Sequence, residues 1–427
     1  MIRISFSQVQ RPVGQGGFQT SFLHSPDLKR HSGTVSRTRI SFAWAYDCGS
    51  DQMSALTAEI RKVSGLRFNV LFLSHLDSDH VAGIDRLLLA ASGVDEVVLP
   101  YLGAEDWALH LAASAASGTL TSSLLDLAAD PAGWLGARGV GRIIFVAGVD
   151  DDDAVGRPDS IEPGRHLPEL PSQDPDGTED AAEPMETDWS RPPRVLDAGD
   201  PASRRAATAL LAHGAVAAVR VAGQRLNWVL SPFAFRPSAA KMATFRNALE
   251  HHFGCCWTAK DYANFARSTE GRARLRKCYD AVWRDHNLHS MALYAGPATP
   301  AGGPRLCTAW HGKFVRPVPP GWISTGDFDA SVTRRRAGLL NYYSPYARMV
   351  GQLGLPHHGS DLSFNPGMLG AFPRLRCAIA AVGPNRYGHP GSAVQTAVAA
   401  APLVDFVRVD EYPSNTYRVR GIVPAWT

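Results

Sequence analysis

The 427-residue chain has few cysteines and lacks any long apolar run. None of its six cysteines forms a C-x-x-C pair, so the sequence indicates neither a disulfide framework nor a zinc finger. Scattered cysteines are typical of a reducing compartment. No stretch approaches the ~20 apolar residues that span a bilayer, and the first residues alternate like a strand, without the apolar centre of a signal peptide. These absences predict a cytoplasmic protein with no membrane partner.

Acidic residues are unevenly spread along the chain. Between Asp150 and Asp200 there are 16 acidic and 4 basic residues, a net charge of −12. This segment is rich in proline and almost free of aromatics, so we expect a disordered or loose surface insertion. Because the whole chain carries +3, the rest carries +15. That balance fits a polyanionic partner such as nucleic acid, although the same asymmetry also serves solubility.

The densest group of chemically capable side chains follows the apolar run 68–73, which the pattern predicts to be a buried strand. Two histidines and two aspartates fall within six positions there, namely His75, Asp77, Asp79 and His80. Imidazole and carboxylate are ligands of zinc, and of manganese where carboxylates are abundant. Aspartate is also common in turns, and Asp79 could cap the next helix, but a turn requires no histidine. The group therefore predicts a metal site.

Three further polar clusters follow apolar runs near the C-terminus. The strand-like stretch 322–326 ends at Asp327, paired histidines His357 and His358 precede a glycine, and His389 follows the apolar run 378–383. Each is weak alone, because aspartate after Thr-Gly is common in turns and histidine is common in surface loops. Together they supply the acid and the imidazoles that the second half of a binuclear site requires.

These motifs, in this order, resemble the metallo-β-lactamase superfamily, and within it the ComEC-like hydrolase branch, close to phosphorylcholine esterases. Residues 75–80 match the His-x-Asp-x-Asp-His form, in which Asp77 replaces the more usual histidine. The other matching stretches are Val13-Gly14-Gln15-Gly16, Asp47-Cys48-Gly49, Asn287-Leu288-His289-Ser290, Thr325-Gly326-Asp327, His357-His358-Gly359-Ser360 and Asn385-Arg386-Tyr387-Gly388-His389-Pro390.

The resemblance implies an α/β fold, the αββα metallo-β-lactamase sandwich. Residues 1–149 and 287–427 would form its two halves. Between them we expect the acidic insertion 150–200 and a mainly helical basic insertion, 201–286. In the first half, the patterns predict strands near 2–9, 17–24, 39–46, 68–73, 95–100 and 142–147, and helices near 52–64, 80–92 and 104–129.

The resemblance also implies a ligand set for two divalent ions, with Zn²⁺ expected first and Mn²⁺ as the alternative. His75 and Asp77 would hold one ion, and Asp79 and His80 the other. Asp327 would be shared by both ions, which would activate a hydroxide. His389 and one of the histidines 357 and 358 would complete the set, while the other histidine and Arg386 would face a phosphate.

The predicted function is metal-dependent hydrolysis, foremost by a phosphodiesterase or nuclease acting on nucleic acid. Three alternatives stay open: a small-molecule or cyclic-nucleotide phosphoesterase, a carboxylic ester, amide or thioester hydrolase, and a non-catalytic metal-stabilised binding module. The insertion 237–286 interleaves basic and aromatic residues, which suits nucleic acid or a protein partner. Aromatics at helical spacing are more often core. His213 precedes a predicted strand and is a further candidate ligand, but a weaker one, because Asp77 and the later histidines can already fill the site.

Overall fold

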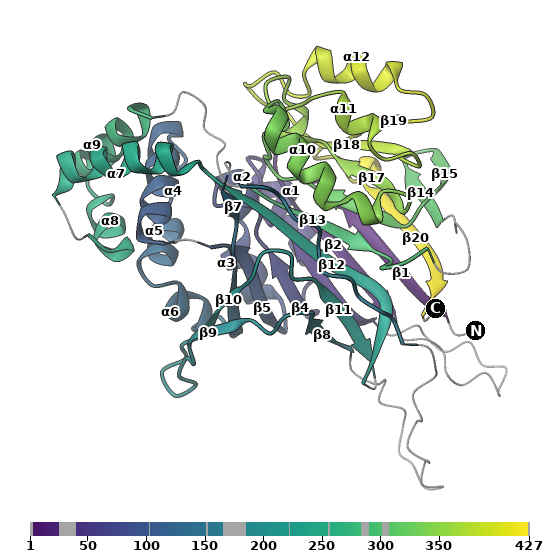
Figure 1. The fold of residues 1–427 in the computed structure, drawn as a ribbon, viewed down its shortest axis with the longest axis horizontal. Coiled ribbons are helices and arrows are strands. Elements are labelled where there is room, and N and C mark those ends of the chain that lie inside the picture. Colours follow the sequence, from purple (N-terminus) through teal and green to yellow (C-terminus); the bar gives the residue numbers. More distant parts are fainter. Residues whose placement is uncertain are drawn as a thin grey trace, which may run out of the picture.

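The structure, a computed structural model, describes residues 3–24, 40–101, 103–150, 153–164, 185–221, 223–254, 257–282, 290–300 and 307–425. Two large mixed sheets pack face to face, and helices cover their outer faces (Figure 1). The predicted α/β class is therefore confirmed. One apolar core lies between the sheets, and one lies under the helices on each side.

Within the described residues, the first sheet has eleven strands, and six of them come from residues 3–146. Strands β3, β4, β5 and β6 run parallel to one another, whereas β1 and β2 pair antiparallel. In sheet order the strands are β15 (Phe314–Val318), β14 (Cys307–His311), β20 (Tyr417–Pro424), β1 (Arg3–Gln10), β2 (Gln19–His24), β3 (Ile40–Tyr46), β4 (Arg67–Phe72), β5 (Gly93–Pro100), β6 (Val140–Val146), β10 (Ala207–Leu211) and β9 (Arg194–Asp197).

The second sheet has nine strands and is built mainly by the C-terminal half. Strands β16, β17, β18 and β19 run parallel. In sheet order the strands are β19 (Asp405–Val409), β18 (Cys377–Ala381), β17 (Val350–Gly354), β16 (Gly321–Ser324), β13 (Met291–Gly296), β12 (Gln224–Arg236), β11 (Ala217–Val221) and β8 (Met185–Trp189), with β7 (Val149–Asp150) beside β12.

The helices form two unequal coverings. On the first sheet lie α1 (Met53–Arg61), α2 (Ser78–Val81), α3 (Ile84–Ala90) and α6 (Pro131–Gly136), together with a group that we call the helical lobe: α4 (Ala104–Ser117), α5 (Ser122–Ala129), α7 (Ala239–Phe253), α8 (Ala259–Phe265) and α9 (Thr269–Asp280). Helices α10 (Thr333–Tyr342), α11 (Gly367–Gly370) and α12 (Ser392–Ala400) cover the second sheet. Within the lobe, α4 packs on α8 and α9, and α5 packs on α8.

The predicted elements of residues 3–146 are confirmed within a few residues, because their apolar periodicity is strong. The helix expected near 80–92 is interrupted at Gly83 and splits into α2 and α3. The expectation of a mainly helical insertion over 201–286 is wrong for its first part, since residues 207–211 form β10 beside β6. The region 201–286 is therefore helical only from α7 onward, and its first part contributes strands to both sheets.

The expectation of disorder across 150–200 is wrong for its described C-terminal part. Residues 185–189 form β8, with Met185 and Trp189 buried and the acids between them more exposed. Arg220 and Arg225 of the adjoining β-hairpin pair with Glu186 and Asp188. The composition of the whole acidic segment did not reveal this short strand, whose first and last residues are apolar and reach the core. Residues 165–184 lie outside the described part of the chain.

Across the helices that the structure describes, none has both the length and the apolar character needed to cross a bilayer.

Candidate metal centre

The predicted ligands come together where the parallel strands of both sheets end. His75 follows β4 in the first sheet, whereas Asp327 follows β16 and His358 follows β17 in the second sheet. Because β16 and β17 are parallel neighbours, their carboxyl ends meet at one edge, which is where α/β folds place their chemistry. The packing of the two sheets brings this edge against the end of β4.

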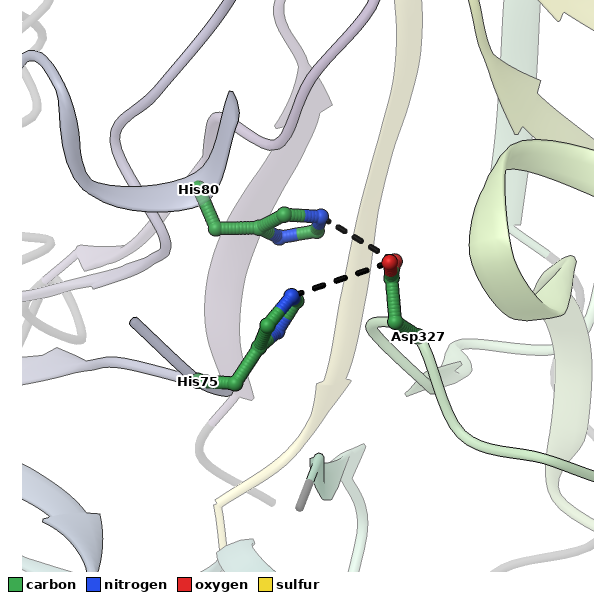
Figure 2. Close-up of side chains that lie close together, drawn as sticks. All are labelled: His75, His80 and Asp327. Atoms are coloured by element: carbon green, nitrogen blue, oxygen red, sulfur yellow. Dashed lines mark ion pairs between the residues drawn. The ribbon is translucent and has the colours of Figure 1, made fainter. Parts of the chain in front are cut away.

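Asp327 lies at the middle of the cluster, with two imidazoles facing each of its carboxylate oxygens. Oδ1 lies 3.1 Å from Nε2 of His80 and 3.7 Å from Nε2 of His358. Oδ2 lies 3.4 Å from Nε2 of His357 and 3.6 Å from Nε2 of His75. Figure 2 shows the rings of His75 and His80 both pointing at this carboxylate. The acid thus joins ligands from both halves of the chain.

The two other predicted aspartates stand on opposite sides of this centre. Asp79 Oδ2 lies 3.2 Å from Nε2 of His358, and Asp77 Oδ2 lies 3.8 Å from Nε2 of His75. Among the described residues, two groups have donor atoms close enough to hold an ion: one is His75, His80 and Asp327, and the other is Asp79, His80 and His358. These buried groups can hold a metal ion.

All four imidazoles turn the same nitrogen inward. Each Nδ1 has a hydrogen-bond partner outside the cluster, so each Nε2 is left for the centre. The partners are Ser74 Oγ for His75 (2.9 Å), Asp47 Oδ2 for His80 (2.8 Å), Ser363 Oγ for His357 (3.3 Å) and the carbonyl of Ala381 for His358 (2.8 Å). A carbonyl only accepts, so the Nδ1 of His358 carries a proton and its Nε2 can offer a lone pair.

The spacing and burial of these atoms suit a divalent cation. Two ligands of a tetrahedral ion at 2.0–2.1 Å lie about 3.3 Å apart, close to the separations in this cluster. Nε2 of His75 is buried and has no hydrogen-bond partner among the described residues. Among the residues that the structure describes, no lysine or arginine forms an ion pair with Asp77, Asp79 or Asp327. The side chains of Asp77, Asp79 and Asp327 are 19, 20 and 4 % exposed, and carboxylates with so little contact with water need a proton or a bound cation to offset their charge.

The pKa shifts express the same excess of buried negative charge. Burial raises the pKa of Asp77 to about 8, and Asp79 and Asp327 add to this rise. Burial opposes protonation of His80, but Asp327 and Asp79 outweigh it and raise the pKa of His80 well above its usual value. The pKa of His75 falls to about 3, because burial and the neighbouring His80 both disfavour its charge. The cluster therefore attracts positive charge onto some groups and keeps a neutral imidazole at His75.

Asp47 and Ser74 support the ligands and were not among the predicted site residues. Asp47 accepts hydrogen bonds from the Ser74 backbone (2.6 Å), the Ser74 hydroxyl (2.7 Å) and Nδ1 of His80 (2.8 Å). Such partners fix the orientation of a metal-binding histidine. The Asp47-Cys48-Gly49 match gave a signal for this position, but only the structure links its carboxylate to His80.

Glycines let the backbone approach the ligands closely. A Cβ at Gly17 would lie 3.0 Å from Nδ1 of His80, and one at Gly49 would lie 2.4 Å from the His80 backbone. Gly326 has φ +52°, and a Cβ there would lie 2.3 Å from the Ser290 hydroxyl, which accepts the amide of Asp327. The small residue at position 17 is thus required by the position of His80.

The paired histidines occupy an unusual backbone. His357, His358 and Gly359 have φ of 48°, 55° and 82°, three successive residues in the left-handed region. Non-glycine residues rarely adopt this region, and they cluster there at functional sites. This turn sends both Nε2 atoms to the same carboxylate, which the ordinary extended backbone would not do.

His389 and Arg386 lie beside the cluster rather than in its centre. The His389 ring is 4.9 Å from that of His357 and 6.5 Å from that of His358, measured between centroids. Nδ1 of His389 is buried and lacks a hydrogen-bond partner among the described residues. Arg386 is exposed and stacks over Tyr387, 5.4 Å from the ring centroid.

Two weaker expectations for the insertions find no support. His213 packs against Phe233 and Tyr342, and no group of potential metal ligands within the described chain includes it. The aromatics of the helical lobe are core: Phe245, Tyr262 and Tyr279 are buried. Residues 287–289 of the Asn-x-x-Ser match lie outside the described residues, whereas Ser290 holds the amide of Asp327.

A scan of the sequence against protein-family models and a search among curated proteins gave no match.

Proposed function

We propose that this chain is a metal-dependent phosphodiesterase of the metallo-β-lactamase type, acting on nucleic acid. The observation that carries the proposal is the cluster around Asp327, where imidazoles from both halves of the chain turn Nε2 toward one shared carboxylate. The two packed sheets with helices on their outer faces are compatible with the αββα sandwich of that family.

The chain offers two adjacent sets of ligands that share Asp327. One set would be His75, Asp77 and Asp327 Oδ2, and the other would be Asp79, His80, His358 and Asp327 Oδ1. His358 is assigned to the second set because it contacts both Asp79 and His80. The hard oxygens of three carboxylates make Mn²⁺ a reasonable occupant beside Zn²⁺.

Two divalent ions, when bound, would supply a water with its pKa lowered from ~15.7 toward ~7 and would neutralise phosphate charge. Asp47 and Ser74 keep His80 and His75 oriented, so that the ligand atoms need no rearrangement. Among the four histidines around Asp327, His357 has the more accessible side chain (28 %), so we assign it to contact the substrate. It could protonate the leaving oxygen or donate to a phosphate oxygen.

The test pairs metal content with cleavage. The purified protein is loaded with Zn²⁺ or Mn²⁺ and offered single- and double-stranded DNA and RNA, beside Asp79→Ala and a control variant, Asp280→Asn, on the exposed end of α9. We expect wild type and control to bind metal and cleave, and Asp79→Ala to lose activity by at least about 10²-fold. No cleavage with either metal, or equal activity of Asp79→Ala and wild type, would refute the proposal.

Salt separates nucleic acid from small esters as the substrate. A polyanion releases counterions when it binds, so its apparent affinity falls steeply between ~50 and ~200 mM salt, whereas a small ester shows little dependence. We therefore expect KM for an oligonucleotide to rise strongly with salt. A flat profile would point to a small phosphoester instead.

A further inference from the structure

An open, solvent-facing cavity of about 530 Å³ lies against residues 384–387, in the loop that leads to His389 beside the cluster around Asp327. One wall comes from the loop that carries Arg386 and Tyr387, and the other comes from Ser117, Gly118 and Thr119 at the end of α4. Asp51, two residues before α1, also lines the cavity. The volume is within the usual range of small-molecule pockets, roughly 300–1,000 Å³.

The cavity adjoins the centre through the loop 383–389. The Tyr387 and His389 rings are 5.8 Å apart, and His389 in turn lies against His357. The Asn385 side chain holds this loop: its amide donates to the carbonyl of His389 (2.8 Å) and its oxygen accepts the amide of Tyr387 (3.0 Å). A ligand in the cavity would therefore sit next to a phosphate at the cluster.

The walls carry charges of opposite sign and one accessible aromatic ring. Arg386 offers a cation, Asp51 an anion, and Tyr387 is 50 % exposed. Ser117 and Thr119 add hydroxyls, which lie 2.8 Å apart. An occupant should thus have an anionic end near Arg386, neutral hydrogen-bond donors near Asp51, and a flat ring for Tyr387.

A nucleoside with an attached phosphate has all three properties. A quaternary ammonium ester fits less well, because the guanidinium of Arg386, 5.4 Å from the centre of the Tyr387 ring, repels a second cation. Base stacking on an aromatic side chain contributes ~1–3 kcal/mol and tolerates any base. A paired base inside a duplex could not enter, whereas a splayed base of a single strand could.

We infer that this cavity binds the nucleoside next to the cleaved phosphodiester, with its base against Tyr387, and that the substrate is single-stranded or entered from a strand end. The inference rests on the proposed phosphodiesterase function. It also gives the helical lobe a role, since α4 supplies one wall of the cavity.

The experiment compares two substrates that differ only in the nucleoside: thymidine 5′-(p-nitrophenyl phosphate) and methyl p-nitrophenyl phosphate. The readout is the ratio of their kcat/KM values. Tyr387→Ala removes the stacking ring, and Thr119→Trp fills the cavity from the opposite wall. Each should lower the ratio about tenfold, and Tyr387→Phe should preserve it. Tyr412→Ala, another exposed tyrosine, is the matched control.

The outcomes separate this inference from the proposed function. A ratio that stays within twofold in Tyr387→Ala and Thr119→Trp overturns the nucleoside site, and so does an equal loss on both substrates, which would mean that Tyr387 only positions His389. If wild type hydrolyses neither substrate, the variants are compared by binding instead, and the proposed function fails only if DNA and RNA are not cleaved either. Binding of fluorescein-labelled trithymidylate, followed by anisotropy, then decides: a tenfold weaker Kd in Tyr387→Ala supports the site, and no difference or no binding overturns it.

Discussion

Acidic side chains have different partners in the histidine and aspartate cluster around Asp327 and in the helical lobe. In the lobe, Arg246 holds Glu105 with two hydrogen bonds and Arg267 holds Asp126, so basic and acidic groups neutralise each other near the surface. In the cluster, by contrast, the carboxylates are buried and face imidazoles. An acid that is paired with arginine needs no further cation, whereas an acid that lies among histidines is neutralised only when the cluster takes up a proton or binds a metal ion.

The comparison also separates two kinds of basic residue. In the sequence, the basic residues between the start of α7 and the end of α9 suit a nucleic-acid surface, but several of these arginines pair with neighbouring acids: Arg246, Arg267, Arg274 and Arg276. Arg386 is different, since it is exposed and stacks on a tyrosine at the mouth of a cavity. Composition alone could not distinguish these cases.

Removing the shared acid should have the largest effect. Asp327→Asn removes the charge that both sets of ligands share, so we expect loss of bound metal and a fall in kcat on the order of 10³-fold, several kcal/mol of lost transition-state stabilisation. Elemental analysis and single-turnover cleavage measure the two effects. Asp126→Asn, which breaks an ion pair in the lobe, is the control. If both variants kept the wild-type metal content, the contrast between the two regions would be false.

Buried histidines of the two regions should respond oppositely to acid. Burial lowers the pKa of His110, on α4, to about 4, whereas carboxylates raise that of His80. A lowered folded-state pKa means that the unfolded chain binds the proton first, so stability is present above pH ~6.5 and is lost as pH falls toward 4, by at most about 3 kcal/mol. Urea unfolding of the metal-free protein should show a shallower loss in His110→Gln. His251→Gln, on the exposed face of α7, is the control. If the free energy of unfolding fell equally with pH in wild type and in His110→Gln, the lowered pKa of His110 would be contradicted.

Weakening the hydrogen bond between Asp47 and His80 should reduce metal affinity less than removing a ligand does. Asp47 has φ +56°, a conformation that asparagine tolerates, so Asp47→Asn tests its charge and its acceptors without added backbone strain. An asparagine oxygen cannot accept from both the Ser74 amide and Nδ1 of His80, and metal affinity or activity should fall ~10–100-fold. Asp95→Asn, a carboxylate that pairs with Arg67 on the same sheet, should change neither. Competition with a zinc chelator gives the affinities.

The sequence predicted the ligand positions better than it predicted the orientation of the ligands. The strands that precede Asp47, His75 and Asp327 are apolar runs followed by polar residues, a pattern that predicts both the strand and the position of polar side chains at its carboxyl end. Local patterns and the order of the motifs therefore predicted that His75, His80 and Asp327 would meet, but they also placed His389 among the ligands, and it lies beside the cluster. They could not predict which nitrogen faces inward, because this depends on distant partners such as Ala381 for His358.

Other features depended on contacts that no local pattern encodes. The left-handed backbone at His357 and His358 places two adjacent side chains on one carboxylate, although the sequence offered only an ambiguous pair. The acidic segment concealed β8, because Met185 and Trp189 are few among many charges. In the lobe, aromatic and basic residues alternate along the helices, and only the packing shows that the rings face each other.

The smallest predicted effect concerns the lobe arginines. Arg246→Ala and Arg267→Ala each break a solvent-screened surface ion pair, so we expect little change in stability from either. If these residues gripped a polyanion, each replacement would also lower the slope of log Kd against log salt by about one, as for a lost phosphate contact. The pairing in the structure predicts an unchanged slope, whereas Arg386→Ala at the cavity should lower it. Fluorescence titrations of a single-stranded oligonucleotide at several salt concentrations measure these slopes. A reduced slope in the lobe variants would move the nucleic-acid contact from the cavity to the helices.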